Sequence, residues 1–139
     1  MLLHIVARGK IGKAPEAELV DRYLKRIAWP TKVTELGERG PLPPRPATCV
    51  TIVLDERGSA FSSTELAQQL ERWRDGGKRE AQFLIGGADG HAAVDRTNAD
   101  LLLSFGPATW PHLLVRAMLA EQLFRATSIL ANHPYHRDG

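Results

Sequence analysis

The alternation of short apolar runs with helix-like segments is the feature of this sequence that most restricts its fold. The apolar runs cover residues 2–7, 31–36, 49–54, 81–85 and 101–105, and each has the length of a strand. Strands that alternate with helices usually pair in parallel, because each helix crosses back over the sheet. We therefore expect an α/β fold with a mostly parallel sheet sandwiched by helices.

Boundary signals support two of the helices. Pro15 suits the first turn of a helix that would end before Trp29–Pro30. Ser62 and Glu65 have the spacing of a capping box, which begins a second helix, and Gly76–Gly77 can end it. Both helices have an apolar stripe that can pack on a sheet.

The last helix, expected from about residue 111 to 130 after a short helix near 92–99, is apolar on two sides. Its apolar positions form two stripes, Leu113, Ala117, Ala120 and Phe124 on one and Val115, Leu119, Leu123 and Ala126 on the other. One stripe can cover the sheet. We expect the second to be left for a partner chain.

Size and composition fit one compact domain, which we expect to span residues 1–139. The chain has 139 residues, 43% of them hydrophobic, and a net charge of only +2, so RNA binding would need a local basic cluster. The one cysteine, Cys49, excludes an internal disulfide and a Cys-based zinc cluster, and it should be buried. We see no signal peptide and no membrane-spanning run, and therefore expect a cytoplasmic protein.

A glycine-rich loop follows the run 81–85. Residues 86–90 read GGADG, and such a loop lets the backbone approach a nucleotide-like cofactor closely. The spacing differs from the G-x-G-x-x-G of dinucleotide sites, and no G-x-x-x-x-G-K-[ST] occurs, which disfavours dehydrogenase and phosphate-loop chemistry. A hydrolase would also lack a recognisable nucleophile motif. By itself the loop can equally be a simple turn.

The C-terminal segment Asn132–Arg137 gathers groups that act in RNA chemistry. Folded over a site, Tyr135 could stack on a base and Arg137 could hold an anionic group. The alternative is a helix cap, in which His133 donates to the last carbonyls of the long helix. Zinc is disfavoured, because no cysteine is near and Pro134 removes the helical spacing of most two-His sites. We expect no metal.

Four motifs, in order along the chain, carry a family resemblance. They are LIGGADG at 84–90, PHLLVR at 111–116, EQLFRA at 121–126 and NHPYHR at 132–137. With them the sequence resembles the RlmH family, the ribosomal RNA large subunit methyltransferases H of the SPOUT superfamily. The likeness continues through 54–55 and 71–73 to the first apolar run, so it covers nearly the whole chain.

The resemblance implies properties that composition and spacing do not. SPOUT proteins have a C-terminal trefoil knot that forms the pocket for S-adenosyl-L-methionine. RlmH-like enzymes methylate N3 of a pseudouridine in large-subunit rRNA, on the assembled ribosome and as homodimers. We therefore expect an α/β knot, this cofactor, this rRNA substrate and a homodimer, into which the second apolar stripe of the last helix would fit.

Matching positions carry the family's site residues to this chain. The resemblance implies cofactor contacts from Leu54, from Gly86 and from one continuous segment that consists of Phe105, Gly106, Pro107, Ala108, Thr109 and Trp110. It implies catalytic roles for His112, Tyr135, His136 and Arg137. Two features depart from the family. A connector at 37–46 with four prolines replaces a longer helical insert, which affects peripheral RNA contacts, and Trp110 replaces the usual Leu, which affects adenine packing.

The chemistry suggests separate roles for the predicted catalytic residues. N3 of a uracil-type base is a weak acid, and a fixed guanidinium at Arg137 would stabilise its developing anion. His112 or His136 would receive or relay the proton. Tyr135 would stack on the base.

The remaining histidines and a basic loop leave room for other interpretations. His4 and His91 lie apart from the tail in sequence, and we expect them to be packing and capping residues. A rival hypothesis of a different class is a non-catalytic, ribosome-associated protein. It would hold RNA with the basic loop Arg8–Lys13 and the tail, without a cofactor.

Overall fold

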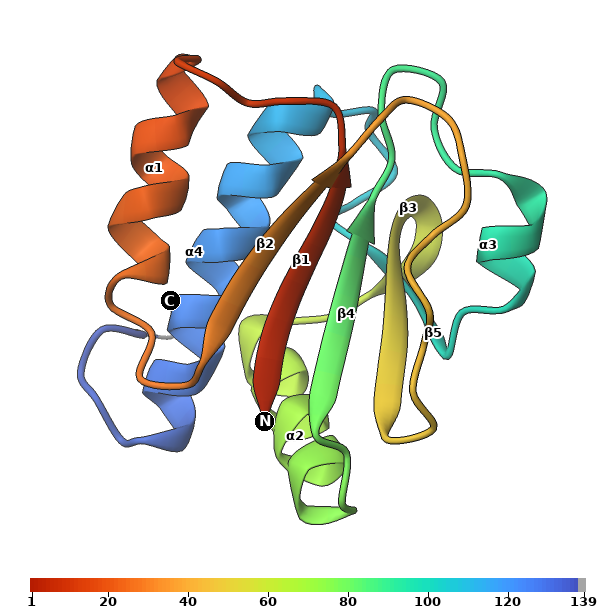
Figure 1. The fold of residues 1–139 in the computed structure, drawn as a ribbon. Helices are drawn as coiled ribbons and strands as arrows, with labels where there is room; N and C mark the ends of the chain where they lie inside the picture. The colour runs from red at the N-terminus through yellow and green to blue at the C-terminus, as the bar shows by residue number, and fades with distance from the viewer. Residues whose placement is uncertain (138–139) are drawn as a thin grey trace.

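A five-stranded sheet forms the centre of the protein. The structure, a computed structural model, describes residues 1–137. The strand order is β2-β1-β4-β3-β5, and all neighbouring strands run parallel (Figure 1). The strands are β1 (Leu2–Arg8), β2 (Thr31–Leu36), β3 (Cys49–Ala60), β4 (Glu80–Ile85) and β5 (Leu101–Ser104). The predicted α/β fold with a mostly parallel sheet is confirmed.

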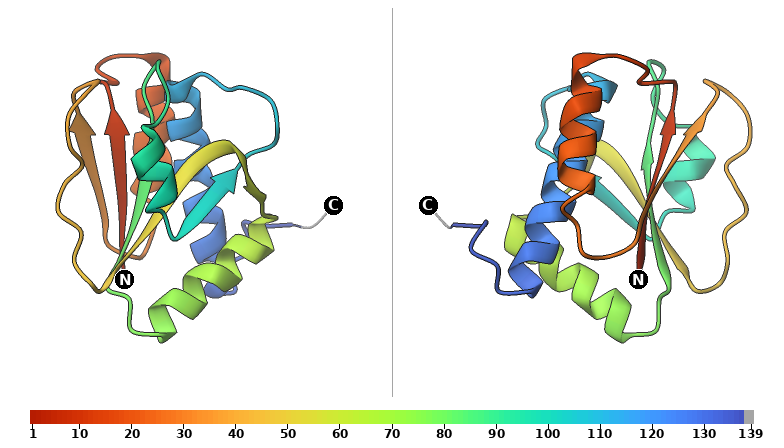
Figure 2. Two further views of the ribbon diagram at one scale, coloured as in Figure 1. Left: turned by 90° about the vertical axis from the view of Figure 1, so that its right-hand side faces the viewer. Right: turned by 60° about the vertical axis from the view of Figure 1, so that its left-hand side comes forward.

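Helices cover both faces of this sheet. They are α1 (Pro15–Leu24), α2 (Ser63–Asp75), α3 (Ala93–Thr97) and α4 (His112–Leu130). The two long helices α2 and α4 lie with α1 on one face, whereas the short α3 lies on the other (Figure 2). On the α3 side, Leu42 of the proline-rich connector packs against Val6, Val53 and Leu84. The connector is therefore a cover for the sheet as well as a link between β2 and β3.

Strand β1 shows how the sequence pattern produces this layering. Leu3, Ile5 and Ala7 belong to the large core beneath the helices, and the intervening Val6 belongs to the small core on the other face. A strand covered on both faces is apolar along nearly its whole length. His4 is buried, with its ring nitrogens 2.8 Å from a Glu80 oxygen and 2.7 Å from the Thr34 hydroxyl, which agrees with its predicted packing role.

The predicted end of β3 is wrong. The sequence pattern ends this strand at Leu54, whereas the strand continues to Ala60. Its register against β5 shifts between Leu54 and Ser59, so an irregular stretch separates two paired parts. A Cβ at position 58 would lie 2.5 Å from the Leu102 carbonyl oxygen, so this close approach needs Gly58. Pairing with a distant strand extends β3, and local periodicity does not report such pairing.

The capping box predicted for α2 is confirmed. The Ser62 hydroxyl accepts a hydrogen bond from the Glu65 backbone N–H at 3.1 Å, and the Glu65 carboxylate accepts one from the Ser62 N–H at 2.9 Å. The helix ends at Gly76, as the sequence predicts. These reciprocal bonds satisfy amide groups that the first turn of a helix leaves without partners.

The prediction that one stripe of α4 stays open for a partner is wrong. Leu119 and Leu123 are fully buried in the large core, and Ala117 and Ala120 are buried against α1 in a smaller cluster. Both stripes are used within one chain, because α4 packs between α1 and α2 as well as on the sheet. Within residues 1–137, no helix is long and apolar enough to cross a membrane. The trefoil knot stays a prediction from the resemblance.

Candidate active site

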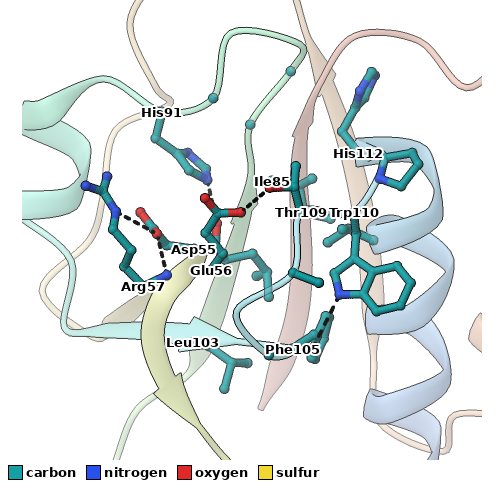
Figure 3. Close-up of a pocket in the computed structure, with 18 of the residues that line it drawn as sticks. Asp55, Glu56, Arg57, Ile85, His91, Leu103, Phe105, Thr109, Trp110 and His112 are labelled. Atoms are coloured by element: carbon teal, nitrogen blue, oxygen red, sulfur yellow. Dashed lines mark hydrogen bonds and ion pairs between the residues drawn. The ribbon is translucent and has the colours of Figure 1, made fainter.

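A cleft of about 570 Å³ opens where the parallel strands end. Residues of β3 and β4 line one wall, and the loop that leads from β5 to α4 lines the other (Figure 3). Ligands of open α/β sheets bind at the carboxyl edge of the strands, and this volume lies in the range of small-molecule sites. The cleft is therefore the candidate active site.

The cleft brings together residues that are far apart in the sequence. Seven of the eight predicted cofactor residues line it: Leu54, Gly86, Phe105, Gly106, Ala108, Thr109 and Trp110. The eighth, Pro107, is exposed in the same loop and does not line the cleft. Three separate segments thus meet at one place, although their roles toward a cofactor stay predictions.

The glycine loop 86–90 is both a tight turn and a wall of the cleft. The Gly90 N–H donates to the Gly87 carbonyl at 3.0 Å, which closes the turn. A Cβ at Gly86 would lie 2.8 Å from the Gly90 carbonyl carbon, closer than real side chains approach backbone. Backbone atoms therefore form this wall, and the two interpretations of the loop are compatible.

A buried carboxylate forms an ion pair with a partly exposed arginine where β3 passes the cleft. The Asp55 carboxylate is 2.6 Å from Nε of Arg96, and it accepts a hydrogen bond from the Arg57 backbone N–H at 2.9 Å. Burial by itself would raise the pKa of Asp55, but this hydrogen bond and the charges of Arg96 and Arg57 hold the pKa below its usual value. Asp55 is therefore ionised and fixes the position of α3 against β3.

The next residue of β3 links the two walls of the cleft. The Thr109 hydroxyl donates to the Glu56 carboxylate at 2.7 Å (Figure 3). The Ser104 hydroxyl binds the Glu56 carbonyl oxygen at 3.2 Å and accepts from the Gly106 N–H at 2.9 Å. These bonds hold the loop after β5 close to β3. Glu56 was not singled out from the sequence; its position two residues after the expected strand was the available signal.

His91 is the second residue of the cleft that sequence reasoning did not place there. Its Nε2 lies 2.9 Å from the Leu54 carbonyl oxygen, and it lines the cleft from the glycine-loop side. Burial lowers the pKa of His91, although its bond to Leu54 opposes this shift. A neutral ring with the proton on Nε2 would donate to that carbonyl. His91 thus bonds a carbonyl group within β3, next to the point where the register against β5 shifts, and its capping role stays a prediction.

Of the four predicted catalytic residues, His112 is the one that lies at the cleft. It is the first residue of α4, and Figure 3 shows it on the opposite side of the cleft from Asp55. Its Nε2 would be 3.8 Å from a Cβ at Gly9, so the end of β1 also reaches this place. Glu38 approaches the same glycine, with its carboxylate 3.1 Å from the Cβ position.

The tail begins as a helix cap. Asn132 has a positive φ of 57°, its N–H donates to the Ile129 carbonyl at 3.1 Å, and the His133 N–H donates to the Ser128 carbonyl at 2.9 Å. This bond pattern is the Schellman motif, which ends a helix by using its free carbonyl groups. The cap interpretation is therefore right for Asn132 and His133, with the backbone N–H as the donor. Within residues 1–137, no cluster of three His, Cys, Asp or Glu could hold a metal ion.

Tyr135 folds the rest of the tail back onto α4. Its ring centre lies 4.5 Å from that of Phe124 and 4.8 Å from the Arg125 guanidinium. The hydroxyl donates to the Glu121 carboxylate at 3.3 Å. Burial, a hydrogen bond with Tyr23 and the charge of Glu121 raise the pKa of Tyr135 to about 12. Arg125 also donates to Nδ1 of His136 at 3.1 Å.

The predicted catalytic residues therefore fall in two places within one chain. Tyr135 contacts α4 at Glu121, which at 1.5 Å per residue lies about 13 Å along the helix from His112. Figure 1 shows the tail at the end of α4 away from the loops that surround the cleft. Arg137 is exposed there. The structure of one chain does not bring the tail to His112.

The fold and the cleft agree with the comparisons to known proteins. The model of a family described as a predicted SPOUT methyltransferase matches residues 1–136. This chain belongs to that SPOUT methyltransferase family.

Its relatives point to one kind of member. The ribosomal RNA large subunit methyltransferases H of Erythrobacter litoralis (strain HTCC2594) and Rhizorhabdus wittichii are 66% and 64% identical to this chain, and the alignments cover 100% of each protein. The relative of that name from Zymomonas mobilis is 54% identical, again over full length.

Solved structures show the same fold at low sequence identity. A probable methylase family protein from Haemophilus influenzae Rd KW20 has a TM-score of 0.58 at 12% identity, covering 94% of this chain and 66% of its own. A probable methyltransferase from Bordetella pertussis Tohama I has a TM-score of 0.54 at 10% identity, covering 91% and 95%.

Proposed function

We propose that this chain uses S-adenosyl-L-methionine to methylate N3 of a pseudouridine in large-subunit rRNA, on the assembled ribosome. The observation that carries this proposal is the cleft, where Leu54, Gly86 and the loop after β5 meet beside His112. Relatives that match over their full length are named ribosomal RNA large subunit methyltransferase H. The family model and the names of these relatives support methyl transfer to large-subunit rRNA.

The residues of the cleft suit this cofactor. Leu54, Gly86 and the loop from Phe105 to Trp110 would hold it, with the glycine backbone as a flat wall for a purine ring. The exposed Glu56 carboxylate provides an acceptor for hydroxyl or ammonium groups. When bound, S-adenosyl-L-methionine supplies a methyl group that its sulfonium already activates.

The work left to the chain's own residues is orientation and proton transfer. His112, on the rim of the cleft, would take the N3 proton of the base or pass it to solvent. Arg137 would stabilise the negative charge that develops on the base, and Tyr135 would stack on the ring. His136 would assist through the tail, where it is bonded to Arg125.

These roles require two chains, because the tail lies at the far end of α4 from the cleft of its own chain. We propose a homodimer in which the tail of each copy reaches the cleft of the other. A twofold dimer makes two such composite sites. The proposed dimer thus explains why the four predicted catalytic residues fall in two places.

Mixing two inactive variants tests the dimer. We expect His112→Ala and Arg137→Ala each to lower methylation of ribosomes by radiolabelled cofactor about 100-fold or more. After subunit exchange, the mixture should recover about a quarter of the wild-type rate, because half of the dimers are mixed and each has one intact composite site. A mixture that stays inactive, although exchange is verified, would show that the tail does not act across the dimer.

Cofactor binding tests the reaction class independently of the ribosome. Calorimetry should show one S-adenosyl-L-methionine bound per cleft in the wild type and in both variants. A folded wild-type protein that binds no cofactor and transfers no methyl group to ribosomes would support a non-catalytic RNA-binding protein instead.

A further inference from the structure

The loop between β1 and α1 presents two lysines close to the cleft. Lys10 and Lys13 are exposed, and within residues 1–137 neither forms an ion pair. Gly9 and Gly12 have positive φ values of 89° and 52°, so the loop turns sharply on both sides of Lys10. Gly9 lies beside His112 on the rim of the cleft, and Lys10 is the next residue along the chain.

A buried cation holds this loop from behind. Arg116 of α4 is 1% exposed, and its guanidinium donates to the Glu35 carboxylate at 2.5 Å and to the Gly9 carbonyl at 3.3 Å. The same Glu35 oxygen accepts from the Ile11 N–H at 2.8 Å. The backbone on each side of Lys10 is therefore tied to β2 and α4. A buried guanidinium without partners would strongly destabilise the fold. The contacts of Arg116 therefore hold the loop firmly against the first turns of α4.

The acidic groups around the loop either bind other groups of the protein or lie on the side of the glycine loop or in the first turn of α1. Bonds from Arg116 and the Ile11 N–H lower the pKa of Glu35, with a smaller effect from the charges of Arg116 and Lys10, so Glu35 is an ionised partner of the buried cation. Glu38 lies against Gly9 and Gly87, on the side of the glycine loop. Glu16 and Glu18 occupy the first turn of α1, where the helix dipole favours acidic residues. The lysines are the exposed charges of the loop itself.

We propose that Lys10 and Lys13 bind the phosphate backbone of RNA next to the methyl-transfer site, and that the Arg116–Glu35 pair positions them. The inference rests on the proposed function, which places an RNA base beside His112. Phosphates that flank such a base must pass over the rim of the cleft, where the loop lies. Lysine is a point charge that suits phosphate without selecting sequence. A loop already fixed by the fold loses less entropy on binding than a mobile one.

The test compares two double variants with equal loss of charge. Lys10→Ala with Lys13→Ala removes the loop charges, and Lys32→Ala with Arg79→Ala removes two exposed charges near the other end of the sheet. Binding of fluorescently labelled protein to assembled ribosomes is measured across KCl concentrations. We expect the loop variant to bind roughly tenfold more weakly and to lower the salt slope by about 1.5, as two lost phosphate contacts would. The control variant should bind like the wild type.

Methyl transfer by the same samples separates this proposal from the proposed function. If the wild type binds ribosomes but transfers no methyl group, the proposed function fails, and the salt slopes still decide the role of the loop. Equal binding by wild type and loop variant, or equal losses in the loop and control variants, would overturn the proposal. Calorimetry should show unchanged affinity of the loop variant for S-adenosyl-L-methionine; a loss there would mean that the lysines serve the cofactor cleft.

Discussion

The two ends of α4 are built in different ways. At its first turn, segments from distant parts of the chain converge on His112: Arg116 bonds Gly9 across 107 residues, Thr109 bonds Glu56 across 53 and His91 bonds Leu54 across 37. In the second half of α4, the tail is held mainly by the helix that it follows. The bonds of Tyr135 to Glu121 and of His136 to Arg125 span 14 and 11 residues.

This difference indicates which part of the proposed site is complete in one chain. The cleft is closed by contacts that form only in the folded sheet, so it should bind a cofactor in a single subunit. The tail is a local attachment with an exposed Arg137, available to a second surface. Changes at the two ends should therefore separate cofactor binding from methyl transfer.

Arg137→Ala should have the largest effect. We expect the rate of methyl transfer to ribosomes to fall by about 100- to 1,000-fold, because a fixed charge that stabilises a developing anion is removed. Affinity for S-adenosyl-L-methionine, measured by calorimetry, should stay at the wild-type value. Arg79→Ala, which removes an exposed arginine directly before β4, serves as the control. Wild-type transfer by Arg137→Ala would remove the tail from catalysis.

Tyr135 separates stacking from the other functions of the tail. Tyr135→Ala should lower methylation at limiting ribosome concentration by about 10- to 100-fold, from a stacking energy of about 1 to 3 kcal/mol. Tyr135→Phe keeps the ring that packs on Phe124 and loses only the bonds of the hydroxyl to Glu121 and Tyr23, so it should retain most activity. Equal losses in the two variants would argue for the hydroxyl and against stacking.

Gly86→Ala should have the smallest of these effects, and it should act at the cleft rather than at the tail. Its Cβ would lie 2.8 Å from the Gly90 backbone, so the glycine loop must shift and the Kd for S-adenosyl-L-methionine should rise about tenfold. Gly37→Ala is a matched control, since the nearest atom to its Cβ is an ordinary 3.7 Å away. If cofactor affinity were unchanged in Gly86→Ala, the cofactor would not lie against this wall.

Local signals in the sequence predicted several features correctly. Ser62, Glu65 and Gly76 define both ends of α2, because caps depend on residues within one turn of each other. The apolar runs located every strand, since burial on both faces of a parallel sheet leaves a continuous apolar signature. Four short motifs then identified the family, and with it the residues that line the cleft.

Other features depended on contacts between distant segments, which local patterns do not report. The extension of β3 needs pairing with β5, and the placement of Glu56 and His91 in the cleft follows from that pairing and from the turn after β4. The second stripe of α4 would be apolar whether it packed within the chain or against a partner chain. It is buried within the chain because α1 and α2 pack beside α4.

The α/β class, the helix caps and the types of side chain in the cleft and the tail could be predicted from the sequence. These properties depend on residues within a few positions of one another, or on short motifs. Only the packing of the sheet and helices places seven of the predicted cofactor residues and His112 around one cleft, with the tail farther along α4. The distance between two such segments is set only when the helices pack on the sheet, because all of these elements bury their apolar faces in the same core.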